Sequence, residues 1–154
     1  MVRLTDMTEA DALHLLSKDC PSFETEPFLA GPPVTERRVA IVTTAGLHQQ
    51  SDRVFDLRDT SYRVIPGGCD TADLVMSHSS VNYDRTGWQQ DVNTVFPLER
   101  LRELKEAGEI GSVAGYHYAL NGAGWEPHEI EPTCDELAKF LKADAVNAVV
   151  VVPV

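Results

Sequence analysis

The stretch Arg38-Val39-Ala40-Ile41-Val42-Thr43-Thr44 is the strongest structural signal in this sequence of 154 residues. It is a continuous apolar run of strand length without alternating polar positions. Such runs are typical of strands that are covered on both faces, as in a parallel sheet. We therefore expect a central parallel strand at residues 38–44.

Strand and helix signals alternate along the rest of the chain. Further strands are predicted at residues 62–65, 73–77, 113–120 and 147–152. A helix is expected behind Pro97, with Asn93 or Thr94 as its cap, Gly108 as its end, and a buried stripe of Leu98, Leu101 and Leu104. A second helix is expected after a capping box at residues 133–136, burying Leu137, Phe140 and Leu141. The alternation predicts an α/β fold, a Rossmann-like three-layer domain with a mainly parallel sheet and flanking helices.

The length fits one α/β domain, which we place at residues 37–154. Residues 1–36 precede it as a separate N-terminal segment. There, Thr8-Glu9-Ala10-Asp11 resembles a capping box for a short helix with Leu13 and Leu16 on one side. A proline-rich arm follows the helix, at Pro21, Pro27, Pro32 and Pro33.

Composition excludes several classes of protein. The 13 basic and 24 acidic residues give a net charge of -11, which repels the phosphate backbone of nucleic acid. No segment approaches the roughly 20 apolar residues of a membrane helix, and no leader pattern opens the chain, so we expect a cytoplasmic protein. The three cysteines, Cys20, Cys69 and Cys134, are scattered and form no CxxC pair, so neither a disulfide framework nor a zinc knuckle is indicated.

Polar residues collect where the predicted strands end, and the binding crevice of an open α/β sheet lies at that edge. Two histidines there, His48 and His78, are candidates for an acid or base. A lone histidine is nevertheless more often structural than catalytic. We do not predict a metal site, because these histidines lack the short spacing of metal ligands. The candidate substrate-binding residues are Thr44, Gly46, Ser79, Asn82, Asp84, Asp91, Asn93 and His117.

Several segments, taken in order, resemble one known family. They are Val39-Ala40-Ile41-Val42-Thr43-Thr44-Ala45-Gly46-Leu47-His48, Ser61-Tyr62-Arg63-Val64-Ile65-Pro66, Ser77-His78-Ser79-Ser80-Val81-Asn82-Tyr83-Asp84, and the run from Gln90 through Leu101. Gly108-Glu109-Ile110-Gly111-Ser112 and the terminal valine strand complete the pattern. Residues 37–154 thus resemble the selenoprotein B family of glycine, betaine, sarcosine and D-proline reductases.

The resemblance implies a reductase that cleaves the carbon–nitrogen bond of a small amino-acid-like substrate. Its nucleophile would be a selenocysteine or cysteine, since a selenolate is ionised at neutral pH. It also implies partner reductase subunits or a homo-oligomer, one partner with a pyruvoyl group, and a dithiol or thioredoxin-like electron donor. In the family, the segment matching Val152-Pro153-Val154 runs directly into the reactive residue. We therefore expect the codon after Val154 to be UGA, read as selenocysteine in the native host; natural loss of the tail is the alternative.

Two other classes of function remain open from the sequence. The domain could be a binding module that holds a small carboxylate or amine with His48, His78, Asn82 and Asp91, without chemistry of its own. It could instead be a metal-dependent hydrolase that uses the rim histidines.

Overall fold

The computed structural model describes residues 3–17, 22, 24, 26, 29–80 and 83–154. At its centre lies β1 (Arg38–Thr43), which pairs in parallel with β5 (Ser112–Val113), β6 (Tyr116–Leu120) and β7 (Ala148–Val152). β7 follows the whole length of β1 on one side, while β5 and β6 line its other side in succession. β3 (Tyr62–Pro66) pairs antiparallel with β6 at the far edge. The expected central parallel strand and the mainly parallel sheet are confirmed.

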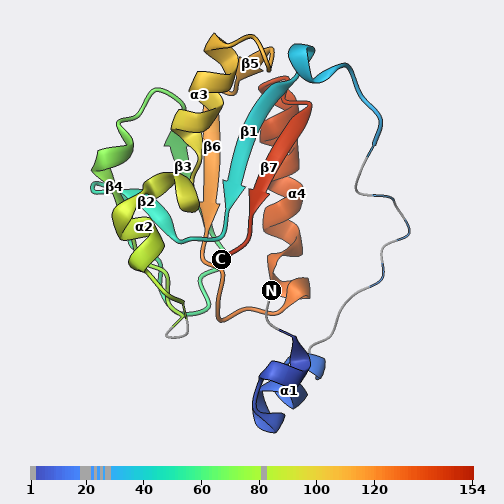
Figure 1. Cartoon of the computed structure of the whole chain (residues 1–154), viewed down its shortest axis with the longest axis vertical. Coiled ribbons are helices and arrows are strands. Elements are labelled where there is room, and N and C mark those ends of the chain that lie inside the picture. The colour runs from blue at the N-terminus through green and yellow to red at the C-terminus, as the bar shows by residue number, and fades with distance from the viewer. Residues whose placement is uncertain (1–2, 18–21, 23, 25, 27–28, 81–82) are drawn as a thin grey trace.

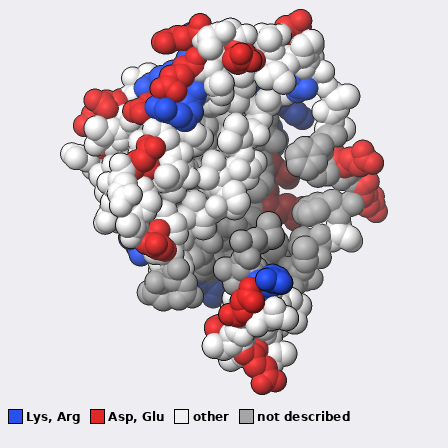
Figure 2. Space-filling view, in the orientation of Figure 1, with Lys and Arg blue, Asp and Glu red and all other residues white. Residues whose placement is uncertain are grey.

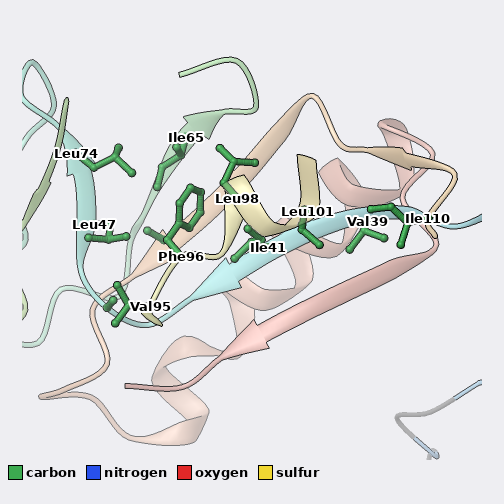
Figure 3. Close-up of a cluster of buried hydrophobic side chains, with 12 residues drawn as sticks. Val39, Ile41, Leu47, Ile65, Leu74, Val95, Phe96, Leu98, Leu101 and Ile110 are labelled. Carbon is green, nitrogen blue, oxygen red and sulfur yellow. The ribbon is translucent and has the colours of Figure 1, made fainter. Parts of the chain in front are cut away.

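Helices cover both faces of this sheet, so the protein has the predicted three-layer α/β fold (Figure 1). α3 (Leu98–Glu106) buries Leu98 and Leu101 on the face that carries Val39 and Ile41. α4 (Pro127–Ala143) buries Ile130 and Leu137 against Tyr118 and Leu120 on the opposite face. The apolar side chains of the first face form the main core, where Phe96 and Ile41 are fully buried between α3 and the strands (Figure 3).

Two short strands form a second sheet that was only half predicted. β2 (Leu47–Gln49) pairs antiparallel with β4 (Leu74–Met76), and neither strand joins the main sheet. The strand expected at residues 73–77 therefore exists, but it does not extend the parallel sheet. A 3-10 turn, η3 (Thr71–Asp73), leads into it.

One predicted helix cap and one predicted helix start were wrong. α3 begins after Pro97, and Asn93 and Thr94 belong to a separate 3-10 turn, η4 (Val92–Thr94), whose own cap is Asp91. α4 begins at Pro127, six residues before the predicted start, because proline is well suited to the first position of a helix. The hydroxyl of Thr133 does not cap a helix; it donates to the carbonyl of Thr60 at 2.8 Å.

The predicted stripe of α3 also needs correction. Leu98 and Leu101 are buried, but Leu104 is 41% exposed. Three residues turn a helix by less than one full turn, so a strict spacing of three drifts around the helix and carries the third leucine off the buried face. In α4, Leu137 is buried as expected, whereas Phe140 is largely exposed. Gly108 ends α3 with a positive φ of 74°, as predicted.

The strand predicted at residues 113–120 is interrupted between β5 and β6, and a histidine fills the gap. The Ile41 N–H faces this interruption and donates to Nδ1 of His117 at 3.0 Å. His117 lies near the start of β6, not near its end as the sequence indicated, and it is fully buried. Its imidazole therefore takes the place of a backbone acceptor inside the sheet.

The N-terminal segment stands apart from the three layers (Figure 1). η1 (Leu4–Asp6) precedes α1 (Glu9–Leu16), and the Thr8 hydroxyl accepts the Asp11 N–H at 3.2 Å, as the capping box predicted. No residue of α1 is buried, so Leu13 and Leu16 remain exposed in the described part of the chain. η2 (Val34–Glu36) joins this segment to β1. The short helix α2 (Thr86–Gln90) lies before η4.

Candidate functional site

A tight turn at Gly46 brings the segment after β4 to the carboxyl end of β1. Gly46 has a φ of +64°, its N–H donates to the Leu120 carbonyl at 2.8 Å, and its carbonyl accepts the Ser77 N–H at 2.9 Å. A Cβ at this position would lie 2.9 Å from the backbone nitrogen of His78. Glycine is therefore needed here both for its conformation and for the close approach of His78.

Thr44 holds the end of the β7 segment at the same edge. Its hydroxyl oxygen accepts the Val154 N–H at 2.8 Å, and the hydroxyl lies 3.3 Å from the Val154 carbonyl oxygen. The Thr44 N–H donates to Val152 at 3.0 Å. Val154 is thus tied to β1 by a side chain beyond the last ladder bond.

Asn121, which follows β6, forms hydrogen bonds to three loops near this edge. Its side chain is fully buried; Nδ2 donates to the Asp56 carbonyl at 3.1 Å and to the Ser79 hydroxyl at 2.8 Å. Its Oδ1 accepts the Ser79 N–H at 3.3 Å. The Asn121 carbonyl accepts the indole N–H of Trp125. Ser79 is therefore oriented by Asn121, which in turn fixes the segment that carries His78.

His78 is the buried titratable side chain at this edge. It is 5% exposed, and its Nδ1 accepts the Ser80 N–H at 3.2 Å. Because a peptide N–H can only donate, the neutral ring must carry its proton on Nε2. Burial lowers the pKa of His78; the Val154 backbone opposes this and Arg85 adds to it. The Nε2 has no hydrogen-bond partner in the described structure, so the Val154 carbonyl is near but not in bonding geometry.

Gly122, which follows Asn121, lies close to this Nε2. A Cβ at Gly122 would lie 2.9 Å from Nε2 of His78 and 2.9 Å from the Thr44 carbonyl, and it would collide with the Val154 carbonyl oxygen. The three groups therefore pack so closely against Gly122 that no side chain fits at this position. We call Thr44, Gly46, His78, Ser79, Asn121, Gly122 and Val154 the strand-end site.

His48 lies elsewhere. It belongs to β2, is 2% exposed, and packs edge-on against Phe55. Its Nδ1 lies 2.7 Å from the Gln49 carbonyl, which can only accept, so this nitrogen carries the proton. The remaining Nε2 is buried without a partner among the described residues. Among the described residues, no hydrogen bond or ring contact joins His48 to His78 or Val154, so the two candidate acid–base histidines have separate surroundings.

Three of the predicted binding residues make local turns instead of facing the strand-end site. Asp84 accepts the Thr86 N–H at 2.9 Å, and Asp91 accepts both the N–H and the side-chain amide of Asn93. These hydrogen bonds lower the pKa of both carboxyl groups. Asp91 also borders a shallow pocket of about 390 Å³ beside α2. Asn82 lies outside the described residues.

His117 is also remote from solvent, at the gap between β5 and β6. Burial lowers its pKa to about 4, with smaller contributions from Arg102 and Arg38 and an opposing one from Asp144. Its ring stands edge-on to Phe96. Thr44, Gly46, His78 and Ser79 are thus the predicted residues that the fold brings together, whereas His48, Asp84, Asp91, Asn93 and His117 lie apart from them.

The described cysteines are not activated. Burial raises the pKa of the Cys69 thiol, and Cys69 packs against the main core. Partial burial also raises the pKa of Cys134, with the carboxylates of Asp135 and Glu131 acting in the same direction. A thiol needs a lowered pKa to be a strong nucleophile at neutral pH, so neither residue has the required environment.

The described residues contain neither a metal-binding cluster nor a membrane-spanning helix. No group of three or more His, Cys, Asp or Glu side chains within them is arranged to hold a metal ion. None of the helices in that part of the chain is both long and apolar enough to cross a membrane.

Sequence reasoning missed Asn121 and Gly122. A sequence signal for them was present, since both directly follow Leu120 at the end of β6. Residues that follow the carboxyl ends of strands are where binding sites of open α/β sheets lie. Only the pairing of β6 with β1 shows that this strand end meets those of β1 and β7.

Comparison with known proteins gives a single family. The family model described as glycine/sarcosine/betaine reductase selenoprotein B matches residues 25–153, which confirms the expected resemblance. The D-proline reductase subunit gamma of Acetoanaerobium sticklandii is 37% identical over 123 residues, covering 76% of this chain and 50% of that subunit.

Two relatives from Peptoclostridium acidaminophilum are more distant. The sarcosine reductase complex component B subunit beta is 32% identical over 119 residues, 73% of this chain and 27% of that subunit. The glycine reductase complex component B subunit gamma is 28% identical over 135 residues, 84% of this chain and 31% of that subunit. The chain thus spans half or less of the length of these relatives. No solved structure matches it.

Proposed function

The chain belongs to the glycine/sarcosine/betaine reductase selenoprotein B family, and we propose from this premise that it is the core of a B-type reductase subunit. Its substrate class would be small amino acids with a cleavable carbon–nitrogen bond: glycine, its N-methylated forms, or D-proline. The cleavage replaces a C–N bond with C–H and needs two electrons, which a dithiol supplies when it is oxidised to a disulfide. Partner reductase subunits, one with a pyruvoyl group, belong to the same proposal.

One observation carries the proposal: Thr44 holds Val154 beside the buried, unpartnered Nε2–H of His78. A buried N–H without a partner costs about 1–3 kcal/mol, so a group that accepts its hydrogen bond is expected at this point. A residue directly after Val154 would follow a carbonyl that packs against Gly122, the same glycine that packs against Nε2 of His78. A selenocysteine or cysteine at that position would supply the nucleophile that Cys69 and Cys134 do not.

The ring of His78 then acts as a hydrogen-bond donor to a negative charge. Its Nδ1 is occupied by the Ser80 N–H, which opposes the doubly protonated form needed for a proton donor. The neutral Nε2–H is the form that the fold favours, and hydrogen bonding to a selenolate or thiolate stabilises the ionised nucleophile. We therefore assign His78, not His48, to the reaction, and prefer anion stabilisation to proton transfer.

The first experiment concerns the gene. The codon after Val154 and its downstream frame are sequenced, and we expect UGA or a cysteine codon followed by a coding continuation. An ordinary UAA or UAG without a cysteine-bearing continuation would overturn the nucleophile assignment.

The second experiment measures turnover. The protein is produced with selenocysteine or cysteine after Val154 and with any continuation that the gene encodes. It is mixed with partner reductase subunits and a dithiol, and supplied with each candidate substrate. Release of ammonia, of the methylated amine, or of ring-opened D-proline reports C–N cleavage. His78→Leu should lower the rate about 100-fold, a typical size for one charge-stabilising donor.

Matched variants separate the possible roles of the histidines. His78→Gln keeps an N–H donor and should retain more activity than His78→Leu, whereas a proton-transfer role predicts equal loss. His48→Gln should have little effect, because His48 has no contact with the strand-end site. Full activity of His78→Leu would exclude the assignment.

A non-catalytic binding module is favoured by one observation, namely that neither described cysteine has a lowered pKa. Titration calorimetry with glycine, sarcosine, betaine and D-proline distinguishes the two functions. Binding without turnover by the extended protein and its partners would favour the module.

A further inference from the structure

β7 forms an open edge of the main sheet. It pairs with β1 along its whole length, and no other described strand lies on its outer side (Figure 1). The opposite edge strand, β3, contacts β2. The edge at β7 is therefore the place where the sheet can accept another strand.

The register shows which peptide groups face outward. The Thr44 N–H donates to the Val152 carbonyl, so Val152 and, by alternation, Val150 and Ala148 direct their backbone groups toward β1. The N–H and C=O of Val149 and Val151 then face the open edge. Within the described residues, no hydrogen bond reaches these groups from outside β7.

The side chains at this edge are apolar and partly exposed to solvent. Ala148, Val150 and Val152 pack against the main core beneath α3. Val149 and Val151 lie on the α4 face and are 40% and 64% exposed, respectively. Natural edge strands are commonly protected by lysine, proline or a bulge, and residues 148–152 contain no such protection. An unpaired valine edge of this kind favours pairing with another strand.

Charge and symmetry indicate which strand would pair with the open edge of β7. Residues 145–154 contain no charged side chain, although the chain carries a net charge of -11. Acidic side chains gather around the margin of the molecule and on α1, while the central surface in this view is mostly uncharged (Figure 2). Two identical β7 strands can therefore meet without the repulsion that the rest of the surface would cause.

We propose that β7 pairs antiparallel with β7 of a second copy of this chain, about a two-fold axis at Val150. In this register Val149 of each copy faces Val151 of the other, and their outward peptide groups form about four hydrogen bonds. Pro153 has no N–H and ends the ladder at each side. The result is a continuous sheet through both copies, an isologous interface that also covers the bare side chains of Val149 and Val151.

The interface is independent of the proposed reductase activity, and oligomeric state tests it. The full chain is studied by sedimentation equilibrium and by light scattering over a range of concentrations, and we expect a dimer. Val149→Lys places a charge in the paired strands and should weaken the dimer about tenfold or more. Circular dichroism checks that the variant is folded.

Val64→Lys is the matched control, because Val64 lies on the opposite edge strand. Its side chain is 39% exposed, nearly the same fraction as the 40% of Val149. It should leave the dimer intact. A monomeric wild-type chain, a dimer that withstands Val149→Lys, or a dimer that Val64→Lys breaks equally would each overturn the proposal.

Hydrogen exchange gives a test without substitutions. The amides of Val149 and Val151 should exchange slowly in the dimer and faster on dilution. Slow exchange in a monomer at every concentration would show that another segment covers the edge, and would also refute the proposal.

Discussion

Two buried histidines of this protein, His117 and His78, differ in what their rings face. Both have a lowered pKa, and both leave Nε2 without a partner in the described structure. His117 is enclosed by the sheet and supplies an acceptor to Ile41, so its surroundings account for its burial. His78 points to the converging ends of β1, β6 and β7. Burial and a shifted pKa therefore do not identify a functional histidine; for His78, the position of its unpartnered nitrogen beside the Val154 segment and the end of β1 does.

The largest difference should be in stability. His117→Leu removes the acceptor of the Ile41 N–H inside the sheet, and we expect a loss of up to about 3 kcal/mol in the free energy of unfolding. His78→Leu should cost about 1 kcal/mol or less, because Ser80 is only partly buried and its amide can turn to water. Urea denaturation measures both. Equal losses would remove the distinction between the two histidines.

The next effect concerns pH. The pKa of His117 in the folded chain is about 4, below the ordinary value of 6.5, so the unfolded chain binds a proton more readily. The stability that the neutral ring provides is complete above pH 6.5 and is lost as the pH falls toward 4. Between about pH 7 and about pH 5 the contribution should fall by about 2 kcal/mol.

His117→Gln keeps an acceptor without a titrating group, so its stability should depend less on pH than that of the wild type. His78→Gln should reduce the pH dependence of stability less, because His78 is less deeply buried than His117. Denaturation curves at the two pH values provide the comparison. An unchanged slope in His117→Gln would contradict the assigned pKa.

A smaller effect compares two glycines with positive φ. Gly46→Ala combines a left-handed conformation, which costs about 1–2 kcal/mol, with a close approach to the His78 backbone. Gly108→Ala has the conformational cost alone, because no atom lies within 4 Å of its added Cβ. Gly46→Ala should be the more destabilising variant and should shift the NMR signals of the His78 ring. Identical behaviour would show that the turn does not position His78.

The smallest effect is expected outside both regions. Cys134→Ser should change the free energy of unfolding by no more than about 0.5 kcal/mol, since the side chain is exposed. Cys69 and Cys134 should react slowly with iodoacetamide at neutral pH, because their pKa values are raised. If modification of either thiol abolished turnover by the extended protein, the nucleophile would have to be sought there.

Local pattern was sufficient for the central elements. The apolar run of β1, the valine run of β7, the cap of α1 and the glycine that ends α3 each depend on residues adjacent in sequence, and all were predicted. The start of α4 was misplaced, because a proline within a helix start and a proline within a loop have the same local signature. The residues expected to cap α3 belong to η4 instead. The exposure of Leu104 could be anticipated from helix geometry alone.

The sequence by itself determined the α/β class, the family, and four of the residues at the strand-end site: Thr44, Gly46, His78 and Ser79. Tertiary structure decided which strand ends meet, because pairing of β1 with β6 and β7 joins segments more than seventy residues apart. It separated His48 and His117 from His78, and it brought in Asn121. Long-range pairing and the direction of a side chain are properties of the packed sheet, and no local pattern encodes them.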